Sequence, residues 1–174
     1  LFPSPTLFRS RTAQIADESL APVIVIDRDQ IERSQAVDVA DLLREHAGLD
    51  IARNGGPGQP TSLFIRGAES NHVLVMVDGV KINPGTIGGA ALQNIDPDLV
   101  ERIEIVKGPR STLYGSDAVG GVINIITRRA AAGLDSDAYI GAGRYDTYKA
   151  GAGVHKGADD YRAGVDAGYT DSAG

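Results

Sequence analysis

The chain has 174 residues and a formal net charge of −6, with 17 Lys and Arg against 23 Asp and Glu. A nucleic-acid-binding face needs clustered cationic side chains, and the densest basic run here is the pair Arg128 and Arg129, so composition argues against a nucleic-acid partner. The sequence contains no Cys, which excludes a disulfide framework and a thiolate metal site.

The N-terminal third of the chain predicts a strand, two helices and a second strand after an irregular start. Residues 1–19 carry no sustained hydrophobic periodicity, so we expect them to be disordered or non-native. Asp27 and Asp29 can cap the first helix, and Gly48 supplies the left-handed residue that closes the second. The predicted elements are a strand at Val23–Ile26, helices at Ile31–Ser34 and Val37–His46, and a strand at Leu49–Arg53.

Two polar, glycine-rich stretches, Asn54–Ser62 and Asn83–Ala91, interrupt the middle of the chain. Both are predicted to be loops, and loops of this length between the strands of a small domain are often functional. The residues between them predict strands, with Asp78 and Gly79 as a hairpin turn. The predicted strands are Leu63–Gly67, Val73–Val77 and Val80–Ile82.

The stretch Ile103–Arg129 predicts a strand, a turn, a small-residue segment and a second strand. Just upstream of this stretch, Asp96 and Pro97 predict the start of a short helical turn. Gly115 and Gly120 match the first half of a phosphate-binding loop, but Gly121 stands where the phosphate-binding Lys belongs. A β-branched run follows in place of a helix whose N-terminus could hold an anion, so nucleotide binding is not expected.

After Arg129 the composition changes to three segments of similar length that are rich in Gly, Ala and Tyr. In the third segment one face carries Tyr161, Ala163, Val165, Ala167 and Tyr169, and the other carries Arg162, Gly164, Asp166, Gly168 and Thr170. An apolar face with Tyr at both ends and a polar, small-residue face are typical of a membrane β-barrel strand of about 9–11 residues. The alternative is an ordinary soluble antiparallel meander.

The sequence offers no constellation for catalysis or metal binding. The three His residues, His46, His72 and His155, form no pair at the spacing of a metal site. No Gly-x-Ser-x-Gly nucleophile motif occurs, and without Cys there is no thiol nucleophile. We therefore expect neither enzyme activity nor a cofactor.

Three segments together resemble the plug domain of TonB-dependent outer-membrane receptors: DVADLLREHAGLDI, SLFIRGAESNHVLVMVDGVKIN and LVERIEIVKGPRSTLYGSDAVGGVINIIT. The resemblance implies an α+β fold, with a small mixed plug domain at 20–129 followed at 130–174 by the first three antiparallel strands of a truncated transmembrane β-barrel. It also implies location in the outer membrane of a Gram-negative bacterium, in contact with its lipid. The plug would gate the barrel during active uptake of a nutrient.

The resemblance further implies a TonB-type energy-transducing partner that pulls on an N-terminal box before the plug. The start of the chain, LFPSPTLFRS, does not resemble such a box, so we expect this coupling element to be missing and the chain as written to be incompetent for transport. Calcium ions order extracellular barrel loops in the cobalamin transporters of this family. Those loops would lie beyond Gly174, and no cofactor is expected within the chain.

Ligand identity depends on the two glycine-rich loops, which this family places together on its outward face. They look closest to those of the cobalamin transporters, since their glycines would admit a bulky ligand and their neutral amides and hydroxyls would suit amide side chains. The implied ligand-binding residues are Asn54, Gly55, Gly56, Gly58, Gln59, Thr61, Ser62, Asn83, Gly85, Gly88 and Gly89. The alternatives are a ferric-siderophore receptor of the same family, whose site would more often offer aromatic or cationic groups, and a soluble α+β binding domain.

Overall fold

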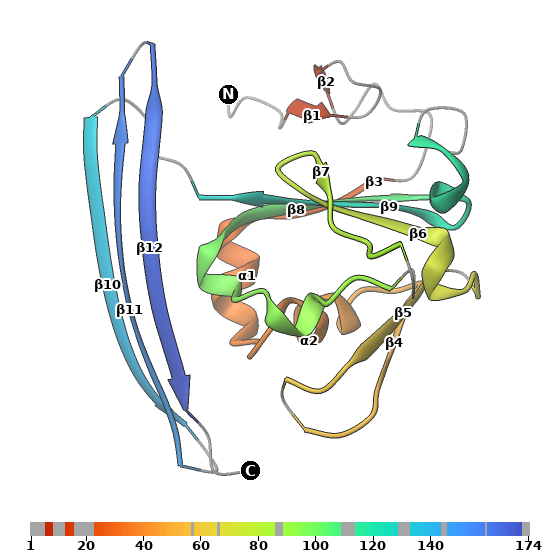
Figure 1. The fold of residues 1–174 in the computed structure, drawn as a ribbon, viewed down its shortest axis with the longest axis horizontal. Helices are drawn as coiled ribbons and strands as arrows, with labels where there is room; N and C mark the ends of the chain where they lie inside the picture. Colours follow the sequence, from red (N-terminus) through yellow and green to blue (C-terminus); the bar gives the residue numbers. More distant parts are fainter. Residues whose placement is uncertain are drawn as a thin grey trace. The chain divides into compact units, whose positions relative to one another are not determined.

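Figure 1 shows a computed structural model, which describes residues 6–8, 13–15, 23–56, 58–65, 67–85, 89–108, 114–128, 133–143, 146–158 and 160–171. The chain divides into two compact units, Leu1–Thr127 and Arg128–Gly174. The described helices are α1 (Arg28–Ser34) and α2 (Val39–Arg44), with 3-10 turns η2 (Ser70–His72), η3 (Leu92–Asn94), η4 (Pro97–Leu99) and η5 (Ser116–Ala118).

The described strands of the first unit form three sheets. They are β1 (Thr6–Phe8), β2 (Ala13–Ile15), β3 (Val23–Ile26), β4 (Leu49–Arg53), β5 (Thr61–Ile65), β6 (Val73–Val77), β7 (Val80–Lys81), β8 (Val100–Lys107) and β9 (Gly121–Thr127). β1 pairs with β2, β4 pairs with β5, and the remaining five strands form a sheet in the order β3-β8-β9-β6-β7. Residues 1–19, expected to be disordered or non-native, contain the β1–β2 pair, and the other residues of that segment lie outside the described ones.

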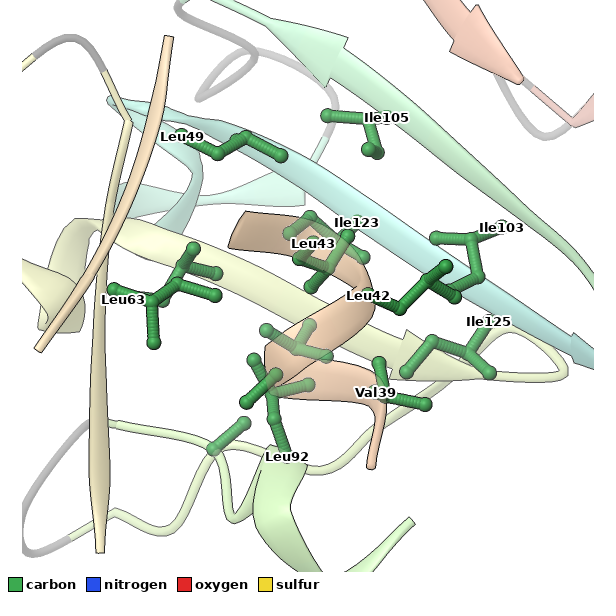
Figure 2. Packing of buried hydrophobic residues seen from close by; sticks show 14 of the residues in the cluster. Val39, Leu42, Leu43, Leu49, Leu63, Leu92, Ile103, Ile105, Ile123 and Ile125 are labelled. Atoms are coloured by element: carbon green, nitrogen blue, oxygen red, sulfur yellow. The ribbon is translucent and has the colours of Figure 1, made fainter. Parts of the chain in front are cut away.

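The five-stranded sheet is mixed, because β6 and β9 run parallel while its other neighbouring strands are antiparallel. α1 and α2 lie on one face of this sheet, below it in the view of Figure 1. Leu42 and Leu43 of α2 share one buried cluster with Ile103, Ile123 and Ile125 of the central strands, and all five are at most 1% exposed (Figure 2). Burying a side chain of this size contributes about 1.5–3 kcal/mol. This packing fixes the position of α2 on the sheet.

The helix caps explain where both helices begin. Asp27 caps α1 as predicted, since its carboxylate accepts the Gln30 N–H at 2.9 Å and the Gln30 side chain accepts the Asp27 N–H at 3.1 Å. The helix predicted over Val37–His46 is shorter at both ends. Asp38 is its N-cap and accepts the Asp41 N–H at 2.9 Å, so the helix cannot start before the residue that follows Asp38.

The predicted hairpin turn at Asp78 and Gly79 joins β6 to β7, and both residues have positive φ, 50° and 82°. The Asp78 carboxylate also accepts two hydrogen bonds from Thr127, one from the backbone N–H at 3.1 Å and one from the hydroxyl at 2.6 Å. The turn is thereby attached to the last residue of β9. Ile82, predicted as part of the strand, lies outside β7, although its N–H donates to the Val75 carbonyl at 3.0 Å.

The second unit is a three-stranded antiparallel sheet in the order β10-β11-β12. Its strands are β10 (Gly133–Gly143), β11 (Thr147–Gly157) and β12 (Arg162–Asp171), joined in continuous register. Their lengths of 11, 11 and 10 residues match the strand length of a membrane barrel.

Burial in this sheet is the reverse of that in a water-soluble protein. Ile140 is 91% exposed, Val165 is 75% exposed and Tyr169 is 67% exposed, whereas His155 on the opposite face is only 4% exposed. His155 Nε2 lies 2.9 Å from the Asp166 carboxylate, so the polar face has a side-chain contact between two strands, in which the Asp166 side chain is 31% exposed. The two faces predicted for β12 are present in its register, with Val165 and Tyr169 on the face opposite His155, although the described side chains of β12 from Ala163 to Asp171 are all exposed.

Within the part of the chain that the structure describes, no helix has the length and apolar character needed to cross a membrane.

Candidate functional site

The first glycine-rich loop is the exposed tip of the β4–β5 hairpin. Its described residues from Asn54 to Pro60 are all exposed, and the chain closes through hydrogen bonds from the Asn54 N–H to the Pro60 carbonyl at 3.5 Å and from the Gln59 N–H to the Gly56 carbonyl at 3.3 Å. A Cβ built at Gly55 would lie 2.8 Å from Gln59 Cγ, whereas a Cβ built at Gly56 would meet nothing within 4 Å. The loop therefore offers open backbone at Gly56.

The predicted boundary of this loop is corrected at its C-terminal end. Thr61 and Ser62, expected in the loop, are the first two residues of β5 and pair with Arg53 and Ala52 of β4. Ladder pairing fixes their backbone groups, so their side chains form the stem of the loop and not its tip.

Both strands of the stem are attached to the rest of the first unit. On β4, Arg53 Nη2 lies 2.7 Å from both carboxylate oxygens of Asp38. On β5, the Thr61 hydroxyl donates to Gln93 Oε1 of η3 at 2.9 Å. Because Arg53 and Thr61 are register partners, these two contacts hold the stem at the same level, directly below the exposed loop.

The ion pair beneath the loop is buried. The Arg53 side chain is 8% exposed and that of Asp38 is 5% exposed, with Asp41 as a second acidic neighbour at 3.3 Å from Arg53 Nη2. Arg53 Nε is buried and has no hydrogen-bond partner among the described residues. Since Asp38 also caps α2, one carboxylate serves both the start of this helix and the stem of the loop.

The second glycine-rich loop is anchored where it begins. Asn83 is 9% exposed, and its amide pairs with the backbone of β6: its oxygen accepts the Val75 N–H at 2.7 Å and its nitrogen donates to the Val73 carbonyl at 2.9 Å. This places the Asn83 side chain inside the domain. Gln93, two residues beyond the end of the loop, carries the contact to Thr61 and so joins the second loop to the stem of the first.

The glycines of the second loop differ in their surroundings. A Cβ built at Gly85 would meet nothing within 4 Å, while one at Gly89 would lie 3.5 Å from Ser70 Oγ. Gly88, the third predicted glycine, lies outside the described residues.

The chemistry of the two loops is neutral. Neither contains a charged or aromatic side chain, so they present amides, hydroxyls and backbone groups. Within the described residues, no three His, Cys, Asp or Glu side chains gather as a metal site. The arrangement can bind a ligand by hydrogen bonds and shape.

Arg53 and Gln93 are positions that sequence reasoning missed. Arg53 looked like the polar end of an alternating strand, and Gln93 lay in a segment with no clear periodicity. The available signal was Arg53 on the position next to the loop, together with two acidic residues at the start of the second helix. A cation adjoining a glycine-rich loop could have been paired with that acidic helix start.

The profile of one protein family, the TonB-dependent Receptor Plug Domain, matches residues 16–122. This match covers more than half of the chain and includes α1, α2, β3 to β8 and the stem described above.

Solved structures of outer-membrane receptors have the same fold. The pyoverdine outer-membrane receptor FpvA from Pseudomonas aeruginosa PAO1, bound to pyoverdine, aligns with a TM-score of 0.81 and 21% identity over 96% of this chain and 24% of its own. The alcaligin outer-membrane receptor FauA from Bordetella pertussis aligns with a TM-score of 0.76 and 19% identity over 92% of this chain and 28% of its own. The siderophore receptor PirA from Acinetobacter baumannii aligns with a TM-score of 0.67 and 25% identity over 88% of this chain and 25% of its own.

These structures confirm the expected fold class, a mixed α+β plug followed by antiparallel strands of a partial barrel, because the alignment with FpvA leaves out only 4% of this chain. The chain spans about a quarter of the length of each receptor. None of the three is described as a cobalamin transporter, so the expected closeness to that group is not supported. The relatives are receptors of the Gram-negative outer membrane, and this is also the location of this protein. The chain belongs to the TonB-dependent receptor plug domain family.

Proposed function

We propose that this chain is the plug and the first barrel strands of a receptor that binds a ferric siderophore and takes it up across the outer membrane. Residues 20–129 act as the plug, and residues 130–174 begin the barrel wall. The observation that carries the proposal is the likeness over 96% of the chain to a receptor solved with its pyoverdine ligand. The sequence-based preference for cobalamin is thereby replaced by its first alternative.

The exposed β4–β5 loop is the proposed plug contact for the ligand. Gly56 allows a bulky chelate to approach the backbone, and Asn54 and Gln59 offer neutral hydrogen-bonding groups. Neither glycine-rich loop carries a cation, so these loops offer no counter-charge for a strongly anionic chelate. We therefore favour an uncharged ferric chelate, such as a ferric trihydroxamate, over a ferric catecholate.

Gating follows from the position of the plug in such a receptor. The ligand binds the outward loops, and a TonB-type energy-transducing partner rearranges the plug by pulling on a segment that precedes it.

Cobalamin is the second candidate, and one observation favours it. The same neutral amides and hydroxyls in both loops suit the amide side chains of cobalamin as well as they suit a neutral ferric chelate. The two ligands differ in size and in the metal they carry, so a direct comparison of binding separates them.

The test is equilibrium binding to a complete receptor that carries this plug, purified in detergent. The probes are a neutral ferric trihydroxamate, a ferric catecholate and cyanocobalamin, each added to the same preparation. We expect the ferric trihydroxamate to bind at least about tenfold more tightly than the other two, a difference of about 1.4 kcal/mol. Tighter binding of cyanocobalamin would overturn the siderophore proposal in favour of the second candidate.

A further inference from the structure

The two strands that form the stem of the exposed loop are each attached to another element of the first unit by a side-chain contact. Arg53 and Thr61 face each other across the last pair of the β4–β5 ladder, and each is attached to a different element, Arg53 to the N-terminus of α2 and Thr61 to η3. A two-stranded hairpin is marginal alone, so these attachments decide where its tip lies relative to the core. These two attachments therefore fix the position of the loop.

The attachment on the β4 side is a buried ion pair. Arg53 and Asp38 are 8% and 5% exposed, and Arg53 Nε has no partner among the described residues. Removing two charges from water is costly, and an apolar pair of similar volume would often stabilise a fold equally well. The pair is therefore poorly explained by stability alone, whereas the directed contacts of the guanidinium specify one geometry.

The same pair connects the loop to the helix layer. The Asp38 carboxylate that contacts Arg53 also accepts the Asp41 N–H at the start of α2. α2 is itself packed on the sheet through fully buried Leu42 and Leu43. The stem thus takes its position from α2, which buries four residues, whereas α1 buries Ile31 alone.

We propose that Arg53 is a positioning residue for ligand binding, which sets the place and order of the 54–60 loop without touching the ligand. This inference rests on the proposed function, in which that loop contacts a ferric chelate. An ordered loop loses less conformational entropy when the ligand binds than a mobile loop does, so fixing the stem raises affinity. Without the Asp38 contact the hairpin samples other orientations, and affinity falls while the fold remains.

The test compares Arg53→Gln, the double variant Asp38→Asn with Arg53→Gln, and the wild type, in the complete receptor that carries this plug. The single variant leaves a buried carboxylate without its cation and is expected to lower thermal stability. In the double variant the Asp38→Asn change removes that charge and keeps a side-chain oxygen that can cap α2, so stability should recover. Arg44→Gln is the matched control, because Arg44 contacts Asp41 at 3.4 Å from a half-exposed position.

Two readouts separate positioning from plain structural support. The first is amide hydrogen exchange across 49–65, which should be about tenfold faster in both Arg53 variants and unchanged in Arg44→Gln. The second is the affinity for a neutral ferric trihydroxamate, which should be about tenfold weaker in the double variant despite its recovered stability. A double variant with wild-type exchange and wild-type affinity would refute the proposal.

Failure of the proposed function would look different. If the wild-type receptor binds no ferric chelate, the siderophore assignment fails, and hydrogen exchange across 49–65 still decides whether Arg53 orders the loop. Unchanged exchange in the double variant overturns the positioning role whatever the ligand is.

Discussion

The phenol ring of Tyr139 on β10 lies over Gly151, its direct partner on β11. A Cβ built at Gly151 would fall 2.5 Å from the ring carbons Cε1 and Cζ, closer than real Cβ contacts come. Tyr139 therefore covers the backbone of its neighbour on the face of the sheet that also carries His155, where a glycine leaves room for an aromatic ring.

Gly151→Ala should destabilise the barrel strands, because the added methyl group must displace the Tyr139 ring or the backbone. We expect a loss of about 1–3 kcal/mol in unfolding free energy, the usual cost of overpacking. The matched control is Gly141→Ala, whose Cβ would meet Lys149 Cβ at an ordinary 3.9 Å. Urea unfolding of the receptor in lipid vesicles measures both, and equal stability of the two variants would contradict the packing described here.

Val165→Arg tests whether the exposed apolar face of the three-stranded sheet contacts lipid. Val165 is 75% exposed, and an Arg near the middle of a lipid-facing strand should cost about 2–4 kcal/mol. Val80→Arg is the control, since Val80 lies on β7 of the plug, outside the three-stranded sheet, and is 68% exposed, so the same change there should stay within about 0.5 kcal/mol. Similar small effects at both positions, measured by unfolding in vesicles, would support the soluble-meander alternative.

His46 should make the stability of the plug depend on pH. Burial lowers the pKa of His46 below its usual 6.5, Lys107 lowers this pKa further, and Glu45 partly offsets both effects. The unfolded chain then binds the proton more readily, so stability falls as pH drops through 6.5 towards the folded pKa and levels off below it. His46→Gln should remove this part of the pH dependence, measured by urea unfolding between about pH 8 and about pH 5. An unchanged profile would show that another group carries it.

A size series at Gly56 tests contact between the exposed loop and the ligand. Gly56 is exposed and a Cβ built there meets nothing within 4 Å, so we expect Gly56→Ala, Gly56→Leu and Gly56→Trp each to change the unfolding free energy by no more than about 0.5 kcal/mol. Affinity for a neutral ferric trihydroxamate should fall progressively as the side chain grows into the ligand's space. From the sequence, we expect bulky substitutions at Gly88 to weaken ligand binding in the same way. Wild-type affinity in Gly56→Trp, with the fold intact, would remove this loop from the site.

Much of the fold could be predicted because its signals are local. The Asp27 cap, the Asp78–Gly79 turn and the alternation of β12 are set by residues next to each other in the chain, and each is present. The length of α2 was overestimated because an apolar stripe does not report which Asp accepts the first helical N–H. The Asp38 side chain decides that boundary.

The composition of the loop could be predicted from the sequence, whereas the contacts that hold its stem could not. Glycine and proline content locates the 54–60 loop, but the contacts of Arg53 with Asp38 and of Thr61 with Gln93 join residues 15 and 32 positions apart. Such pairs depend on the packing of whole elements, which a pattern within one segment does not report. Asn83 shows the same limit, because a loop-like polar residue proved to be buried against β6.

Hydrogen exchange of a complete receptor with and without bound ferric trihydroxamate tests the central claim most directly. The claim is that the exposed tip of the β4–β5 hairpin contacts a ferric siderophore. We predict that saturating ligand slows amide exchange across residues 54–60 and leaves α1, at Arg28–Ser34, unchanged. Tight binding of the chelate with no change in exchange across residues 54–60 would contradict the account, because the ligand would then be held without this loop.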